Sequence, residues 1–162
     1  MTDPAARLLA EAYAAHGPAC RLYARALTDD PDDVIQEAFI RLARRLTAGE
    51  PLPEHLRAWL LTAVRSAAID ARRRSQRRRN HEAAAFAQRP MFEPAEGLDA
   101  AAAERALQDL PQRQREAVVL RIWGGLGFEA IAQMTGVATS TAHADFTAGI
   151  AELRRRMGAK DG

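Results

Sequence analysis

The sequence LRAWLLTAVRSAAIDARRRSQRRR, residues 56–79, contains two patterns that together decide the fold. Its first two-thirds place apolar residues every three or four positions, which predicts a helix with one buried face. The residues of that face are Leu56, Leu60, Ala63, Val64, Ala67 and Ala71. In the last third, arginines surround Ser75 and Gln76 on every side, so no face of the helix can be buried there. We therefore predict a helix that is anchored in a small core at one end and strongly basic at the other.

This dense positive charge favours a phosphate backbone as its partner, because each phosphate that an arginine neutralises releases condensed counterions. The alternative is a solvated basic segment that only keeps the protein soluble. The charge pattern favours nucleic acid over that alternative. The candidate DNA-binding residues of this part of the chain are Arg65, Arg72, Arg73, Arg74, Arg77, Arg78 and Arg79.

Composition predicts an all-α protein, because the 162 residues are rich in Ala, Leu and Arg and poor in aromatic and β-branched residues. Residues 1–79 contain 14 arginines and ten acidic residues, whereas residues 80–99 contain one arginine and four acidic residues. Residues 100–162 are nearly neutral. This change of charge predicts two small helical domains, 1–80 and 99–158, joined by a flexible linker, 81–98.

Several classes of protein and site are disfavoured. Cys20 is the only cysteine and the four histidines lie far apart, so we expect neither a disulfide nor a zinc site. The acidic run at 29–33 matches a helix start, where carboxylates stabilise the N-terminus, better than it matches a calcium loop. No apolar run approaches the ~20 residues of a membrane span, so we expect a cytoplasmic protein without membrane insertion. No cofactor is expected.

The first domain is expected to begin with a helix over residues 4–15, a break at His16-Gly17-Pro18 and a second helix to Leu27. Tyr13 and Tyr23 are expected in its core. A third helix starts near Pro31, and its predicted inner face comprises Ile35, Ala38, Phe39, Leu42 and Leu46. Ile40 falls on its polar outer face, which indicates a protein contact there.

The second domain has the pattern of a helix-turn-helix. We predict helices over 100–108, 112–123, 128–134 and 140–156, with a tight turn at Thr135-Gly136-Val137. On the last helix, the predicted buried residues are Ala142, Phe146, Gly149, Ile150 and Leu153. The residues left to face outward are Ser140, Ala144, Thr147, Ala148 and Ala151, and none of them is charged.

Five stretches resemble a known family. DPDDVIQEAFIRL at 30–42, and RAWLL at 57–61 with AIDARRR at 68–74, resemble region 2 of bacterial sigma-70 factors. LPQRQRE at 110–116 and GLGFEAIA at 125–132 resemble region 4 of the same factors. A chain with only these two regions is similar to the extracytoplasmic-function (ECF) type of sigma factor.

The resemblance implies an alternative sigma factor, not an enzyme, that directs core RNA polymerase to promoters and has an anti-sigma factor as a partner. It implies that the β′ clamp helices of polymerase bind the face formed by Asp33, Gln36, Glu37, Ile40 and Arg41, and that the β flap binds region 4. It also implies that the basic helix binds and opens the −10 element. In the family, the turn matching 48–55 holds an unstacked base, but here that turn has no aromatic residue.

The sequence departs from the family at two places. Ser66 stands where the family often has asparagine, and Asp145 stands where the family has an arginine that faces the DNA. We expect weakened −35 recognition, since a bidentate arginine contact to a base is worth ~1–3 kcal/mol. The residues that we assign to DNA contact in the helix-turn-helix are Ser140, Thr141, His143, Ala144 and Thr147.

Two other functions stay open at this point. A sigma-like interaction protein would bind polymerase or a regulator without selecting promoters. A nuclease would use the carboxylates of 29–33, but no second acidic cluster, lysine or histidine converges on them by spacing.

Overall fold

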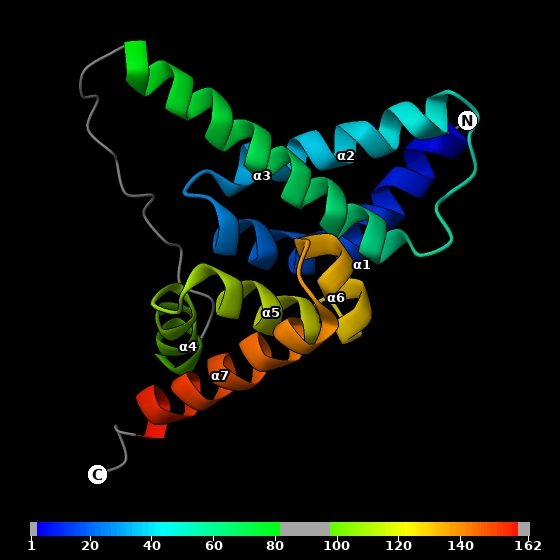
Figure 1. The fold of residues 1–162 in the computed structure, drawn as a ribbon. Coiled ribbons are helices and arrows are strands. Elements are labelled where there is room, and N and C mark those ends of the chain that lie inside the picture. The colour runs from blue at the N-terminus through cyan, green and yellow to red at the C-terminus, as the bar shows by residue number, and fades with distance from the viewer. Residues whose placement is uncertain (1–2, 82–97, 159–162) are drawn as a thin grey trace. The chain divides into compact units, whose positions relative to one another are not determined.

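A computed structural model describes residues 3–81 and 98–158, which form seven α-helices and no strand (Figure 1). The chain divides into two compact units, residues 1–90 and 91–162. We call them the N-terminal unit and the C-terminal unit and describe each separately. The all-α prediction is confirmed. No helix of the described residues is long and apolar enough to cross a membrane.

The N-terminal unit contains α1 (Pro4–Leu27), α2 (Pro31–Thr47) and α3 (Leu56–His81), and each helix packs on the other two. Its core contains Tyr23, Leu42, Leu60, Leu61 and Val64, all fully buried. The predicted inner face of α3 is confirmed, since its central residues are buried and its arginine-rich end is exposed. In Figure 1, that end of α3 extends beyond the two helices on which the rest of α3 packs.

The predicted break at His16-Gly17-Pro18 is wrong, because α1 continues through Pro18 as one helix of 24 residues. A proline inside a helix removes one N–H donor and crowds the preceding turn. Here the helix on both sides of the proline is held by packing, with Gly17, Cys20 and Tyr23 buried against the unit. Tertiary contacts therefore outweigh the local signal for a break.

The two tyrosines of α1 have different environments. Tyr23 is fully buried as predicted, but the prediction for Tyr13 is wrong because 47% of this residue is exposed. The Tyr13 ring meets the Phe39 ring edge-on at 5.0 Å, and its hydroxyl accepts a hydrogen bond of 3.1 Å from Arg21. Tyr13 thus covers the edge of the core while its hydroxyl stays at the surface.

The C-terminal unit contains α4 (Leu98–Gln108), α5 (Gln112–Ile122), α6 (Phe128–Thr135) and α7 (Thr139–Gly158). Helix α7 packs on the other three helices of this unit. The boundaries differ from the predicted ones by two residues or fewer. The core residues include Leu107, Leu110, Val118, Val119, Leu120, Leu126, Ile131 and Ala142.

Two glycines make the helix-turn-helix geometry possible. Gly136 ends α6 with φ of 72°, a left-handed conformation that glycine adopts without steric cost. Gly149 lies where α7 crosses α5, and a Cβ atom there would stand 2.7 Å from Cγ2 of Val118 and 3.2 Å from the Gln114 carbonyl oxygen. The absence of a side chain at Gly149 therefore sets how closely α5 and α7 pack.

Candidate nucleic-acid interface

The C-terminal end of α3 presents a dense group of cations, which we call the arginine segment (residues 72–79). Its described side chains, Arg72, Arg73, Arg74, Arg77 and Arg78, are all exposed. No ion pair or hydrogen bond joins these five side chains to any other group in the described part of the chain. Arg79 continues the helix, but its side chain lies outside the described residues. These cations are thus available to an external anion.

Arg65 lies two turns nearer the core and differs from the arginine segment. Its side chain is half-buried and already interacts within the protein. The structure therefore does not place Arg65 with the exposed arginines with which the sequence analysis grouped it.

Arg41 of α2 joins that helix to α3 just before the arginine segment begins. Its guanidinium donates to Glu37 Oε1 at 3.1 Å and to the Ser66 hydroxyl at 3.1 Å, and it lies 3.6 Å from Asp70 Oδ2. Only 31% of the Arg41 side chain is exposed. Ser66, the residue where the family often has asparagine, is therefore a hydrogen-bond partner of Arg41, and the bridge fixes the direction of α3.

The residues assigned to polymerase binding share one side of α2. Asp33, Gln36 and Ile40 are exposed, and Ile40 is an exposed apolar residue among polar neighbours. Glu37 and Arg41 are half-buried and paired with each other. Their spacing of three and four residues makes this a single continuous face.

The loop between α2 and α3 is shaped by Arg45. This side chain donates to the Pro51 carbonyl oxygen at 2.8 Å and pairs with Glu50 at 2.9 Å. Gly49 provides the left-handed residue of the turn, with φ of 73°. Leu52 is 39% exposed at the surface of this loop. Trp59, the nearest aromatic residue, is half-buried in α3.

The five residues assigned to DNA contact in the helix-turn-helix lie along the first half of α7. Ser140, His143, Ala144 and Thr147 are exposed and Thr141 is half-buried. The Thr147 hydroxyl donates to the His143 carbonyl oxygen of its own helix at 2.9 Å. The prediction that this outward face carries no charge is confirmed, since the exposed residues on it are small or polar and uncharged.

Asp145 does not face outward from α7 as an isolated carboxylate. Its Oδ2 atom accepts from Arg113 Nε at 3.1 Å and lies 2.9 Å from Arg113 Nη2. The Asp145 side chain is 21% exposed and that of Arg113 is 59% exposed. Sequence analysis missed this ion pair because the residues are 32 positions apart; the only signal was that an acid replaces a basic residue.

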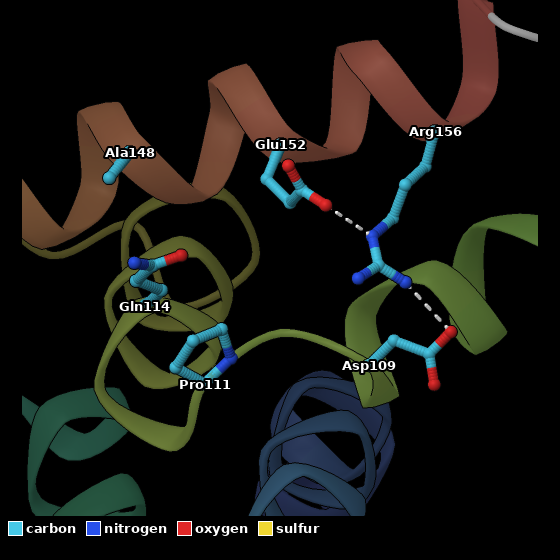
Figure 2. Close-up of a pocket in the computed structure, with 6 residues that line it drawn as sticks. All are labelled: Asp109, Pro111, Gln114, Ala148, Glu152 and Arg156. Carbon is cyan, nitrogen blue, oxygen red and sulfur yellow. Dashed lines mark hydrogen bonds and ion pairs between the residues drawn. The ribbon is translucent and has the colours of Figure 1, made fainter.

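Another set of ion pairs, shown in Figure 2, joins the second half of α7 to Asp109, the residue that follows α4. Arg156 contacts Glu152 at 2.7 Å and Asp109 at 2.9 Å. Hydrogen bonds from Arg155 and then Arg156 lower the pKa of Glu152 to about 2. Asp109, Glu152 and Arg156 line an open hollow of about 420 Å³ together with Pro111, Gln114 and Ala148. Its charged residues are paired with one another, so they stabilise the unit.

Three titratable groups of the described N-terminal unit have shifted pKa values. Burial raises the pKa of the Cys20 thiol to about 11, and burial with the nearby Arg57 lowers the pKa of His16. Burial, and then Asp33, raises the pKa of Asp30. Within residues 3–81 and 98–158, no three acidic, histidine or cysteine side chains are grouped so that they could hold a metal ion.

Comparison with known proteins agrees with this geometry. A family model of Sigma-70 region 2 matches residues 12–78, and one of Sigma-70, region 4 matches residues 100–153. The ECF RNA polymerase sigma factor EcfG of Rhodopseudomonas palustris (strain TIE-1) is 30% identical over 129 residues, which cover 76% of this chain and 71% of EcfG. The chain belongs to the ECF sigma factor family.

Solved structures resemble the fold of this sigma factor. One is the sigma factor RpoE of Bartonella quintana in complex with the anti-sigma factor NepR, with 24% identity and a TM-score of 0.74 over 90% of this chain and 94% of RpoE. Another is CnrH in complex with the cytosolic domain of CnrY, with 22% identity and a TM-score of 0.57 over 94% of this chain and 89% of CnrH. At these identities the likeness concerns the fold.

The matched ranges relate the sigma regions to the candidate sites. The region 2 match contains the α2 face, the α2–α3 loop and the arginine segment up to Arg78. The region 4 match contains α5, α6 and most of α7, including the Arg113–Asp145 pair, but ends before Arg155 and Arg156. The predicted linker, residues 81–98, lies almost entirely outside the described residues.

Proposed function

We propose that this ECF sigma factor directs core RNA polymerase to promoters and initiates transcription, with region 2 as its main DNA-binding part. The observation that carries the proposal is the arginine segment at the exposed end of α3, whose described guanidinium groups have no partner in the described chain. Such a segment suits a promoter, where several closely spaced phosphates can each receive an arginine.

Within this proposal, residues 1–80 form the region 2 domain and residues 99–158 the region 4 domain. Arg72, Arg73, Arg74, Arg77, Arg78 and Arg79 contact promoter DNA, with Arg65 supporting them from its half-buried position. Asp33, Gln36 and Ile40 on α2 contact the β′ clamp helices. Glu37 and Arg41 complete that face and hold it against α3.

Region 4 has a smaller share of DNA recognition in this proposal. Ser140, Thr141, His143, Ala144 and Thr147 supply hydroxyl, imidazole and methyl groups to the major groove, but no guanidinium. Such side chains give fewer and weaker base contacts than the bidentate contacts of arginine. The β flap is the proposed polymerase partner of this unit.

The relatives suggest a further partner and a location. Because RpoE of Bartonella quintana was solved with an anti-sigma factor, and CnrH with the cytosolic domain of CnrY, we propose that an anti-sigma factor also binds this chain. Because its proposed partner is core RNA polymerase, we propose that the protein acts in the cytoplasm. The protein performs no catalysis itself, because polymerase supplies the chemistry.

Run-off transcription tests the proposal. Purified core polymerase and this protein are incubated with a library of genomic fragments, and the transcripts are sequenced. We expect transcripts whose start sites lie downstream of a common pair of promoter elements. These transcripts should be absent without the sigma factor. Binding to core polymerase without promoter-dependent transcripts would instead favour a sigma-like interaction protein, which the uncharged outer face of α7 also suits.

A further inference from the structure

The Arg113–Asp145 pair connects the first turn of α5 to the first half of α7. Two nitrogens of the Arg113 guanidinium, Nε and Nη2, approach Asp145 Oδ2 at 3.1 Å and 2.9 Å. The arginine is the more open partner, with 59% of its side chain exposed against 21% for the aspartate. The guanidinium is thus held at the surface, beside the part of α7 that carries the assigned DNA contacts.

Arg113 differs in position from other paired arginines of the C-terminal unit. Arg155 and Arg156 are paired with Glu152 near the end of α7, beyond the assigned DNA contacts. Arg121 donates to the Leu126 carbonyl oxygen at 3.0 Å, and its guanidinium lies 4.8 Å from the Phe128 ring centre. Arg113 is instead paired to Asp145, which lies between Ala144 and Thr147 on α7.

We propose that Arg113 is a phosphate-contacting residue of this helix-turn-helix and that Asp145 competes with DNA phosphate for its guanidinium. A carboxylate and a phosphate present similar pairs of anionic oxygens to an arginine. The first half of α7, where the assigned DNA contacts lie, has no arginine or lysine, so Arg113 brings positive charge to it from the neighbouring helix. Asp145 neutralises this charge when DNA is absent and repels the phosphate when DNA approaches.

The proposal rests on the proposed function and explains why DNA binding by region 4 is weak in this chain. The cause is a specific ion pair rather than only the lack of arginines on α7. It follows that one substitution, Asp145→Asn, should free the guanidinium while keeping the size and shape of the side chain. The gain should then depend on Arg113.

The test measures binding of the full-length protein to a duplex oligonucleotide of random sequence between about 50 and 200 mM salt, the range in which phosphate contacts are sensitive to ions. Four variants are compared with the wild type: Asp145→Asn, Arg113→Ala, the double variant, and Glu129→Gln. Glu129 is the matched control, because it is an exposed carboxylate in the first turn of α6 with no ion pair among the described residues. Circular dichroism and thermal unfolding verify that each variant is folded.

We expect Asp145→Asn to bind more tightly and to steepen the dependence of log K on log salt by about 0.9, the value of one added phosphate contact. Its advantage over wild type should then shrink by about threefold across the salt range. Arg113→Ala should weaken wild-type binding, because it removes the guanidinium and leaves the Asp145 carboxylate unpaired beside the DNA. The double variant should bind no more tightly than the wild type. Glu129→Gln should not steepen the slope.

Three results would overturn the inference: no gain from Asp145→Asn, an equal change in slope from Glu129→Gln, or a gain that persists in the double variant. The last two would mean that any lost carboxylate relieves repulsion without a role for Arg113. Each of these leaves the proposed function intact, since run-off transcription by the wild-type protein tests that function separately.

Discussion

The arginine segment of region 2 and the paired arginines of region 4 differ in their surroundings. In region 2, the described arginines from Arg72 to Arg78 project from the end of α3 and pair with no carboxylate in the described chain. In region 4, Arg113, Arg155 and Arg156 are paired with Asp145 or Glu152. The arginines at the end of α3 therefore have no carboxylate beside them, whereas these three arginines of region 4 are held by carboxylates of their own unit. Counting charges cannot distinguish the two situations; the positions of the carboxylates do.

The stability of region 4 depends on close contact between α5 and α7, and Gly149→Ala should disturb that contact. The added methyl group would stand 2.7 Å from Val118, which is fully buried and cannot move easily. Overpacking costs about 1–3 kcal/mol, and alanine recovers at most about 1 kcal/mol as the better helix former. We expect a net loss of about 1–2 kcal/mol.

Amide hydrogen exchange, followed residue by residue, measures the stability of each unit separately. Protection should fall in α5 and α7 of the Gly149→Ala variant and stay unchanged in α1 to α3. Gly158→Ala is the control, because a Cβ atom there meets nothing within 4 Å. Equal effects from both substitutions would show that space beside Gly149 does not limit the packing.

Region 2 also contains paired arginines, including Arg21, Arg41 and Arg45, and of these Arg41 joins α2 to α3. Arg41→Ala removes its contacts with Glu37, Ser66 and Asp70. We expect it to destabilise the N-terminal unit by about 1 kcal/mol, because these ion pairs are partly exposed and an exposed pair is worth about 0.2–1 kcal/mol. Arg41→Lys should recover part of the loss by keeping the charge. Urea unfolding monitored by circular dichroism gives these values.

Arg44→Ala is the matched control for Arg41, because Arg44 is exposed on the same helix. We expect its effect to stay within about 0.5 kcal/mol, as for ordinary surface substitutions. If Arg44→Ala destabilised the unit as much as Arg41→Ala, the bridge between α2 and α3 would have no special role.

The smallest expected effect is a change in how the stability of region 4 depends on pH. Arg155 and then Arg156 hold the pKa of Glu152 at about 2, below its ordinary value of 4.5. A lowered folded-state pKa adds stability above pH 4.5, and this contribution disappears as pH falls toward 2. Glu152→Gln should thus slightly lower the unfolding temperature at neutral pH, and the difference from wild type should vanish in acid. A difference that stayed constant across that range would exclude the ion pairs as its cause.

A structural feature could be predicted from the sequence when the residues that determine it lie close together along the chain. Apolar spacing sufficed to place α3 and its buried face, because that signal lies within one helix. The same was true of the helix-turn-helix, where Gly136 marks the turn by its own conformation. Local signals failed at Pro18, because contacts made by the rest of α1 keep the helix continuous.

The residues of the candidate site could be predicted only where their side chains are not paired with residues distant in the sequence. The five described exposed arginines could be predicted because they surround one helix end in the sequence itself. The pairing of Arg113 with Asp145, and of Arg41 with Ser66, joins residues that are 32 and 25 positions apart. Nothing in one sequence specifies such pairs, since they depend on how helices cross. The function of an individual charge was therefore the hardest property to infer.

One measurement tests the contrast between the two units directly: the salt dependence of promoter binding by two double variants, each in complex with core polymerase. Arg72→Ala with Arg73→Ala should lower the slope of log K against log salt by about 1.4–1.8, the value of two lost contacts to single-stranded or duplex DNA, and should leave the unfolding temperature unchanged. Arg155→Ala with Arg156→Ala should lower the unfolding temperature and leave the slope unchanged. Equal slopes in the first variant and the wild type would contradict the assignment of the arginine segment to promoter DNA.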